Sequence, residues 1–247
     1  MSYDAGSLKI MKKRTKHIDD SQWTSRDEAL WTTAEVAVLL NRGQLEHRHP
    51  LPVPFALRLG GQEERILAHG PFRLFSWTAP GDGSYTHNTS MMVATGRGGL
   101  AMMAGFAAAR AIGNSSRRRQ AESMSQPRWL QIDQGTLSVG NFGFYLHSPS
   151  GIPAWNWGGI HAASLAAPGR LSIDGISENG PVKWVLHSDW AELVFLLWAS
   201  VCSPDHPQMT GRTWLPEEWL TRAMVFAAGS PGRQGLEGFR EIMAGLR

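Results

Sequence analysis

Nine histidines and a single cysteine are the residues of this 247-residue chain that could supply metal ligands, a general base or a nucleophile. His47 and His49 flank an arginine, but a structural zinc site normally needs four donors. Cys202, Asp205 and His206 place a thiol, a carboxylate and an imidazole close together in sequence. We interpret the segment with His47 and His49 as a solvated loop. We interpret the cluster that begins at Cys202 as a helix end with a buried cysteine. The sequence therefore predicts no metal site and no cofactor.

His187, Ser188 and Asp189 hold the three residue types of a hydrolytic triad. Side chains of consecutive residues point in different directions, whereas the members of a triad converge on one point. Ser188 and Asp189 are better explained as capping groups of the helix that follows them. The chain also lacks the Gly-x-Ser-x-Gly elbow of a nucleophilic serine. We therefore assign no catalytic residue, and the sequence favours a protein that is not an enzyme.

A glycine-rich segment at residues 81–88 is the best candidate for a small-molecule site. Its two glycines permit a close approach of the backbone, and its polar side chains could contact a ligand. It lacks the Lys-Ser/Thr ending of a phosphate loop, and Gly and Asp are common in structural turns, which is the simpler interpretation. The candidate ligand contacts are Asp82, Ser84, His87 and Asn88.

Two basic clusters could contact an anionic partner. Residues 1–17 hold five of the 24 basic residues and one of the 21 acidic residues, so the rest of the chain is close to neutral. A dedicated nucleic-acid domain would concentrate positive charge on its folded surface. Polybasic segments are attracted to anionic membranes, although a solvated arm and an exposed helix end explain these two clusters as well. The candidate contacts are Lys12, Lys13, Arg14, Arg117, Arg118 and Arg119.

The same composition bears on location. A single cysteine excludes an internal disulfide and fits a reducing compartment. The basic start runs into acidic residues instead of an apolar stretch, so no secretory signal is predicted. The most apolar segment, residues 91–109, is interrupted by Arg97, and we interpret it as a packed helix, with a membrane-associated segment as the alternative. We expect a cytoplasmic protein, with peripheral attachment at the inner membrane face as the alternative.

The pattern along the chain divides it into four parts. Residues 1–21 are predicted to form a disordered basic tail, and residues 22–61 an N-terminal helix and a proline-rich connector. Residues 62–203 are predicted to form a β-rich domain with an insertion at about residues 80–127. Residues 204–247 are predicted to form a C-terminal helical extension.

Two helices flank the β-rich domain. Ser25 and Glu28 have the spacing of a capping box before the first helix, as do Asp189 and Glu192 before the second. Pro204 is expected to end the second helix. The apolar face of this helix is predicted to consist of Leu193, Leu196, Leu197 and Val201.

Short apolar runs separated by Gly, Pro, Asn and Ser predict antiparallel strands. The first is expected at residues 65–78, with a break or bulge at Gly70-Pro71. Further strands are expected from Trp129 to Ser188, in the runs QIDQGTLSV, GFYLH, AWNW, LSIDGIS and PVKWVLHS. In the run AWNW, Trp155 and Trp157 are predicted to pack in the core, with an exposed partner-binding patch as the alternative.

A hairpin sequence gives the chain a resemblance to a known family. Residues Gly135, Thr136, Leu137, Val139 and Asn141 resemble the Gly-Thr-Leu-x-Val-Thr-Asn hairpin of bacterial pleckstrin-homology-like (PH-like) and GRAM-like domains. The resemblance covers residues 62–203 and implies a small antiparallel β-barrel closed by the helix at residues 189–202. Phe142-Gly143 replaces the basic pair of the family, which weakens the expectation of an anionic contact at this turn.

Tryptophan motifs extend the resemblance to actinobacterial proteins that carry this domain. These motifs are Pro127-Arg128-Trp129, Trp155-Asn156-Trp157 and Trp214-Leu215-Pro216.

The sequence thus predicts an α+β fold with a PH-like or GRAM-like barrel, a helical insertion and flanking helices. The function that it favours is a non-enzymatic binding or scaffold module that engages a protein partner or an anionic membrane surface. A small-molecule enzyme of hydrolase type, using residues 81–88, is the alternative. Binding of nucleic acid through the basic tail is the third hypothesis. The identity of the partner and the oligomeric state stay open.

Overall fold

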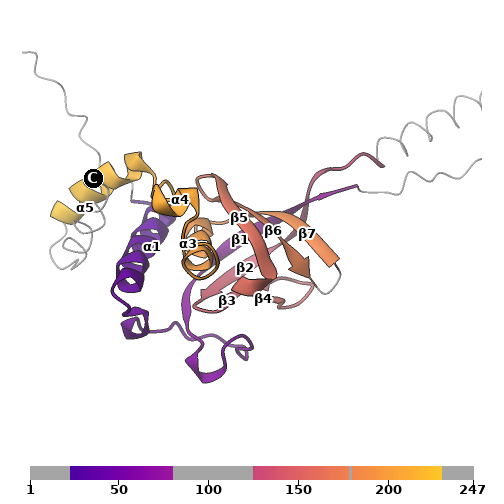
Figure 1. The fold of residues 1–247 in the computed structure, drawn as a ribbon, viewed down its shortest axis with the longest axis horizontal. Coiled ribbons are helices and arrows are strands. Elements are labelled where there is room, and N and C mark those ends of the chain that lie inside the picture. Colours follow the sequence, from indigo (N-terminus) through magenta and orange to yellow (C-terminus); the bar gives the residue numbers. More distant parts are fainter. Residues whose placement is uncertain (1–22, 80–124, 178–179, 230–247) are drawn as a thin grey trace, which may run out of the picture.

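The computed structural model describes residues 23–79, 125–177 and 180–229, which form an α+β fold (Figure 1). The predicted fold class is thereby confirmed. The strands are β1 (Ile66–Thr78), β2 (Arg128–Gly140), β3 (Gly143–His147), β4 (Ala154–Asn156), β5 (Ile160–Ala167), β6 (Arg170–Ser177) and β7 (Gly180–His187). The α-helices are α1 (Ser25–Asn41), α3 (Ala191–Cys202), α4 (Pro207–Thr210) and α5 (Glu217–Gly229). Short 3₁₀ turns are η2 (Leu45–His47), η3 (Gly61–Glu63) and η4 (Trp157–Gly159).

The seven strands form one antiparallel sheet in the order β4-β3-β2-β1-β7-β6-β5. The strand β1 pairs with β2 from Ile66 to Thr78, but with β7 only from Arg73 to Ser76. The two outermost strands, β4 and β5, follow each other in the chain, and no ladder joins them among the described strands. The predicted antiparallel strands are confirmed, whereas their pairing leaves the sheet open and does not close the predicted barrel.

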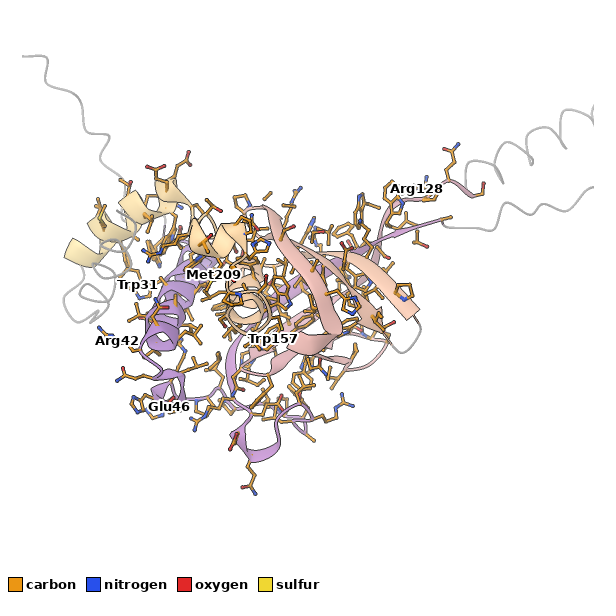
Figure 2. All side chains as sticks on the ribbon, viewed as in Figure 1. Trp31, Arg42, Glu46, Arg128, Trp157 and Met209 are labelled. Carbon is orange, nitrogen blue, oxygen red and sulfur yellow. The ribbon has the colours of Figure 1, made fainter. Side chains whose placement is uncertain are left out.

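The sheet curls around α3, and the core lies between them. Trp155 of β4 reaches Trp184 of β7, with ring centroids 4.6 Å apart, although three strands lie between β4 and β7 in the sheet. Every residue of α3 from Ala191 to Ala199 is buried. Figure 1 shows α1 on the side of α3 that faces away from the sheet, with α5 beyond α1. In Figure 2, Trp157 lies in this core, while Arg128 lies on the β1–β2 ribbon far from the helices.

Both flanking helices form, but neither begins with the predicted capping box. The N-cap of α1 is Thr24, whose hydroxyl accepts from the backbone N–H of Asp27, while the Asp27 carboxylate accepts from the backbone N–H of Thr24. The box is therefore one residue earlier than Ser25 and Glu28. The hydroxyl of Ser25 instead donates to the carboxylate of Asp189 at 2.9 Å.

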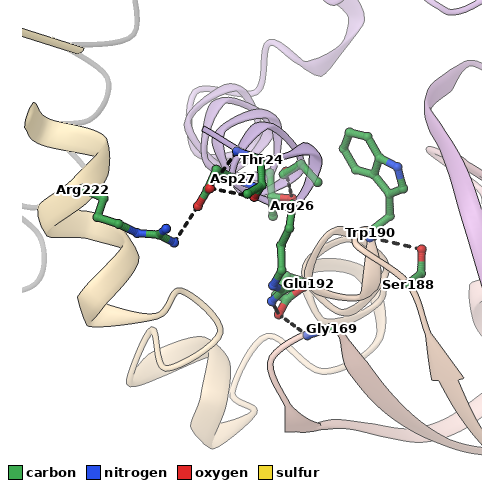
Figure 3. Close-up of polar contacts among 10 residues, drawn as sticks. Thr24, Arg26, Asp27, Gly169, Ser188, Trp190, Glu192 and Arg222 are labelled. Carbon is green, nitrogen blue, oxygen red and sulfur yellow. Dashed lines mark hydrogen bonds and ion pairs between the residues drawn. The ribbon is translucent and has the colours of Figure 1, made fainter. Parts of the chain in front are cut away.

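The helix α3 follows Trp190, and no side chain caps it. Its Glu192 is 1% exposed and accepts from the guanidinium of Arg26 and from the backbone N–H of Gly169 (Figure 3). The predicted capping role of Glu192 is wrong because this carboxylate ties α1 and the β5–β6 turn to α3. The helix ends at Cys202, just before Pro204. Val201 is 64% exposed, so its predicted place on the buried face is also wrong.

A buried carboxylate fastens the proline-rich connector to β3. Glu64 accepts from the backbone N–H groups of Leu59 and Gly60 and from the hydroxyl of Tyr145 at 2.6 Å. Tyr145 in turn accepts from the backbone N–H of Arg58 at 2.7 Å. Burial and the hydrogen bond to Glu64 raise the pKa of Tyr145 above its usual value. The phenol therefore stays neutral and donates its proton across the whole physiological range.

The strands agree with the sequence except in two places. The strand β5 was not among the predicted runs, because its sequence IHAASLAA is rich in alanine, which has little preference for strands. The predicted break at Gly70-Pro71 is wrong, since both residues continue the ladder with β2. The register irregularities lie instead between Ile66 and Ala68 and between Leu74 and Phe75.

Side chains from the C-terminal helices contact the backbone of the outer strand β5. The amide of Gln208 accepts from the N–H of Leu165 at 2.8 Å and donates to the carbonyl of the same residue at 2.9 Å. The indole of Trp198 donates to the carbonyl of Ile160 at 3.1 Å. These contacts hold α3 and α4 against β5.

The backbones of β2 and β3 approach each other closely at Gly135, the first residue of the family-like hairpin. An added Cβ would lie 1.8 Å from the carbonyl oxygen of His147, a backbone atom that no side-chain rotation can move. We expect Gly135→Ala to lower the free energy of unfolding by about 1–3 kcal/mol, as overpacking does. The matched control is Gly158→Ala, whose Cβ would meet no atom closer than 3.6 Å. Urea denaturation of both variants measures the difference, and equal midpoints would contradict the close approach.

Candidate anion-binding interface

The site residues predicted from sequence all lie outside the described residues. This holds for the ligand-contact candidates Asp82, Ser84, His87 and Asn88 and for the anionic-surface candidates Lys12, Lys13, Arg14, Arg117, Arg118 and Arg119. The predicted tail, the predicted insertion helix and the end of the C-terminal extension fall there too. A different candidate site lies within the described residues.

Arg73, His187 and Arg170 lie side by side on three adjacent strands. Arg73 of β1 is opposite His187 of β7, and His187 is opposite Arg170 of β6. Directly opposite residues have Cβ atoms about 5 Å apart. Their sequence neighbours point into the core, so alternation places the three basic side chains on the outer face of the sheet. We call these three residues the basic row. The buried neighbours are Phe72, Leu186 and Leu171.

Among the described residues, the two arginines of the basic row have no ion-pair partner. Both arginines are exposed. The half-buried ring of His187 contacts Phe75, with ring centroids 4.4 Å apart. Arg73 and Arg170 lie two strands apart on the same face, about 10 Å from each other, so their like charges repel weakly. The row is thus an arrangement that a bound anion would relieve.

The basic row lines an open cleft of about 710 Å³. Arg26 of α1 also lines it, but its guanidinium is paired with the buried Glu192 (Figure 3). One carboxylate lines the cleft, that of Asp189, which accepts a hydrogen bond from the Ser25 hydroxyl at 2.9 Å. The remaining walls come from the β5–β6 turn, β2 and the β3–β4 loop, so the row lies in a recess. They include Pro168, Gly169, Gln134 and Pro149.

The electrostatics of the recess act on His187. Burial lowers the pKa of this imidazole below its usual value, and the positive charges of Arg170 and Arg73 lower it further. The histidine is therefore neutral at pH 7 in the free protein. An anion placed between the two arginines would offset their charge and favour the imidazolium.

The triad interpretation of His187, Ser188 and Asp189 finds no support in the geometry. Ser188 is buried, its hydroxyl donates to the carbonyl of Pro71, and the same oxygen accepts from the N–H of Trp190. The predicted capping role of Ser188 and Asp189 is wrong, because the N-cap of α3 is Trp190 and no side chain caps this helix.

The cysteine cluster is structural. The Nδ1 atom of His206 accepts from the backbone N–H of Gln208 at the start of α4, and its ring packs against Phe195. Cys202 is exposed, so the predicted buried cysteine is wrong. The side chain of His47 is also exposed, and among the described residues no three metal-ligating side chains gather.

One further pair combines a hydroxyl with an imidazole. Ser138 Oγ lies 3.3 Å from Nε2 of His147 on the outer face of β2 and β3. Ser138 is only 2% exposed, and the ring of Phe55 packs against the imidazole. A substrate could not reach this hydroxyl, so the pair cannot act as nucleophile and base. The two tryptophans of the AWNW run, Trp155 and Trp157, are buried, which confirms their core role.

The fold and this interface define an α+β protein with an open, curled sheet and a basic recess on its outer face. Comparison with protein-family models and with curated proteins finds no match. None of the helices in the described residues has the length and apolar character needed to cross a bilayer.

The repulsion within the basic row predicts that removing one charge stabilises the protein. We expect Arg170→Gln to raise the free energy of unfolding by up to about 0.4 kcal/mol at low salt, because the weak repulsion between Arg170 and Arg73, about 10 Å apart, disappears. The gain should shrink as the ionic strength rises toward about 0.15 M, since salt screens exposed charges.

Lys183→Gln is the matched control for this prediction. Lys183 lies on β7 as well, but its ammonium is 3.8 Å from the carboxylate of Asp174. Its substitution should give no gain, and urea denaturation at two salt concentrations measures both variants. If Arg170→Gln instead lowered the free energy of unfolding at low salt, Arg170 would have a stabilising ion-pair partner within the protein.

Proposed function

We propose that this protein is a non-enzymatic binding module with a PH-like or GRAM-like frame, and that its basic row binds an acidic segment of a partner protein. The frame is supported by the two antiparallel meanders, β1–β4 and β5–β7, and by the helix α3 that follows the last strand. The hairpin residues from Gly135 to Asn141 support it from the sequence side.

One observation carries the proposed binding function. Three basic side chains stand in register on β1, β7 and β6, without an ion pair to either arginine in the described residues. The carboxylate that lines the recess, Asp189, accepts from Ser25 and forms an ion pair with neither arginine, whereas Asp174 pairs with Lys183 on the same face. Arginines bind carboxylates through two parallel hydrogen bonds, which suits an acidic peptide.

The recess favours a protein segment over a membrane surface as the partner. The row lines a cleft with walls from α1, the β5–β6 turn and the β3–β4 loop. A narrow peptide side chain can enter such a recess, whereas the flat surface of a bilayer meets projecting residues first. The enzyme that would use residues 81–88 and the nucleic-acid contact of the basic tail stay predictions, because both depend on residues outside those described.

Charge reversal tests the proposed site. A fluorescein-labelled peptide of ten glutamates is the probe, and fluorescence anisotropy at low salt gives the dissociation constant. We expect the double variant Arg73→Glu, Arg170→Glu to weaken binding by at least about tenfold, because each lost charge-assisted contact contributes about 1.5–3 kcal/mol. Lys183→Gln, on the same face, should bind like the unchanged protein.

The comparison with vesicles separates the two classes of partner. In co-sedimentation with anionic phosphatidylserine vesicles, the double variant and the unchanged protein should bind to the same extent. Equal binding of the peptide by the double variant and the unchanged protein would overturn the site. Vesicle binding that requires the two arginines would overturn the protein partner.

The protonation of His187 leads to a prediction about the pH dependence of binding. The pKa of His187 is lowered by burial, then by Arg170 and Arg73, so the free protein holds this ring neutral. A bound carboxylate raises that pKa again, and binding then takes up a proton. Affinity for the glutamate peptide should therefore increase as the pH falls from about 7.5 to about 5.5, where the glutamates are still ionised.

His187→Gln should remove this pH dependence while the peptide still binds. Of the other groups at this position, Arg73 and Arg170 do not titrate in this range. The carboxylate of Asp189 lines the same cleft. Titrations by anisotropy at several pH values give the comparison. A dependence that persists in the variant would assign the effect to another group.

A further inference from the structure

The outer face of β1 continues from the basic row into an aromatic surface. Because side chains alternate along a strand, Arg73, Phe75 and Trp77 share this face. Trp77 is 50% exposed and forms an edge-to-face pair with Trp129 of β2, which is 41% exposed, with ring centroids 5.6 Å apart. Exposed large aromatic side chains that meet in pairs are typical of partner contacts. We call Trp77 and Trp129 the tryptophan pair.

A second cleft lies beside the tryptophan pair. It has a volume of about 590 Å³ and lies between the end of β1 and the β6–β7 hairpin. The ionisable residues that line it are His161, Asp174 and Lys183, and the last two face each other at 3.8 Å and offset each other's charge. The cleft therefore offers no net charge to a ligand and suits an apolar group. Its other lining residues include Trp77, Ile176, Pro181 and Val182.

The distance between the two clefts follows from the strand that they share. Trp77 is four residues after Arg73 on β1, which corresponds to about 13 Å along a strand. Between them, Phe75 and Val185 stand opposite each other on β1 and β7 and are half-buried. The face thus presents a basic recess, an apolar midpoint and an aromatic end in one line.

We infer that the partner of this protein is a peptide segment that combines carboxylates with a large apolar side chain about 13 Å away. This inference rests on the proposed binding function of the basic row and adds the second contact. In an extended peptide the two groups are four residues apart, because such a chain rises about 3.3 Å per residue. The carboxylates occupy the basic recess, and the apolar side chain packs on the tryptophan pair.

Charge complementarity identifies a separate protein as the source of this segment. The three long parts of the chain outside the described residues each carry more basic than acidic residues, and the remaining two residues, 178–179, hold a single glutamate. Residues 1–22 hold five basic and three acidic residues, residues 80–124 five and two, and residues 230–247 three and two. A net basic segment is repelled by Arg73 and Arg170, so these parts do not supply the carboxylates.

Three labelled peptides of equal length test the inference. The first carries three consecutive glutamates in a Gly-Ser background, the second adds a tryptophan four residues after the last glutamate, and the third adds it one residue after. Anisotropy titrations give their dissociation constants for the full chain. We expect the second peptide to bind about tenfold tighter than the other two, because burial of an aromatic side chain contributes about that factor.

The double variant Trp77→Ala, Trp129→Ala should lose this advantage and bind all three peptides alike. Both side chains are exposed, so the core remains, and urea denaturation verifies the fold. Met224→Ala is the matched control, because Met224 is a similarly exposed apolar residue on α5. This control should keep the preference for the second peptide.

The outcomes separate the two proposals. Binding of the glutamate-only peptide that depends on Arg73 and Arg170, without any effect of tryptophan position, overturns the second contact and leaves the proposed function in place. No binding of any peptide overturns both. Anionic phosphatidylserine vesicles form the last arm: binding to them that requires the tryptophan pair would assign this face to a lipid surface and overturn the peptide partner.

Discussion

The double pairing of β1 is the interaction on which the rest of the structure depends. Four register pairs, from Arg73 to Ser76, connect β1 to β7, and through them the β5–β7 meander joins the β1–β4 meander. Beyond Pro71 the two strands separate, and Ser188 donates to the carbonyl of Pro71 where they part. Trp190 fills the space above Gly70, where an added Cβ would lie 2.4 Å from the indole nitrogen. The shape of the whole sheet follows from where this short ladder begins and ends.

The same ladder couples the core to the interface. The register that buries Leu74 and Leu186 on the inner face also aligns Arg73 with His187 on the outer face. A shift by one residue would reverse both faces, so the protein cannot keep this core and separate the charges. The buried Glu192 adds to this coupling, because it binds Arg26 of α1 and the β5–β6 turn that precedes Arg170.

The elements of this fold were largely predictable, whereas the interface was not. Alternation, short apolar runs and helical periodicity indicated β1, β2, β3, β4, β6, β7 and both flanking helices, but the alanine-rich β5 carries too weak a strand signal. Each candidate site was a cluster of neighbours in sequence, such as residues 81–88. The basic row joins residues 73, 170 and 187, which only the order of the strands brings together. Alternation does indicate that Arg73 and His187 point away from the core, so a known topology would have been sufficient to find the row.

The contacts on β5 have a consequence for association between chains. An outer strand normally exposes unpaired N–H and C=O groups, which can recruit a strand from another molecule and start aggregation. Here the amide of Gln208 occupies both backbone groups of Leu165, and the indole of Trp198 occupies the carbonyl of Ile160. The side chains thus imitate a neighbouring strand at these positions. A chain that lost α4 would expose the backbone N–H and C=O of Leu165 as a template for intermolecular sheet growth.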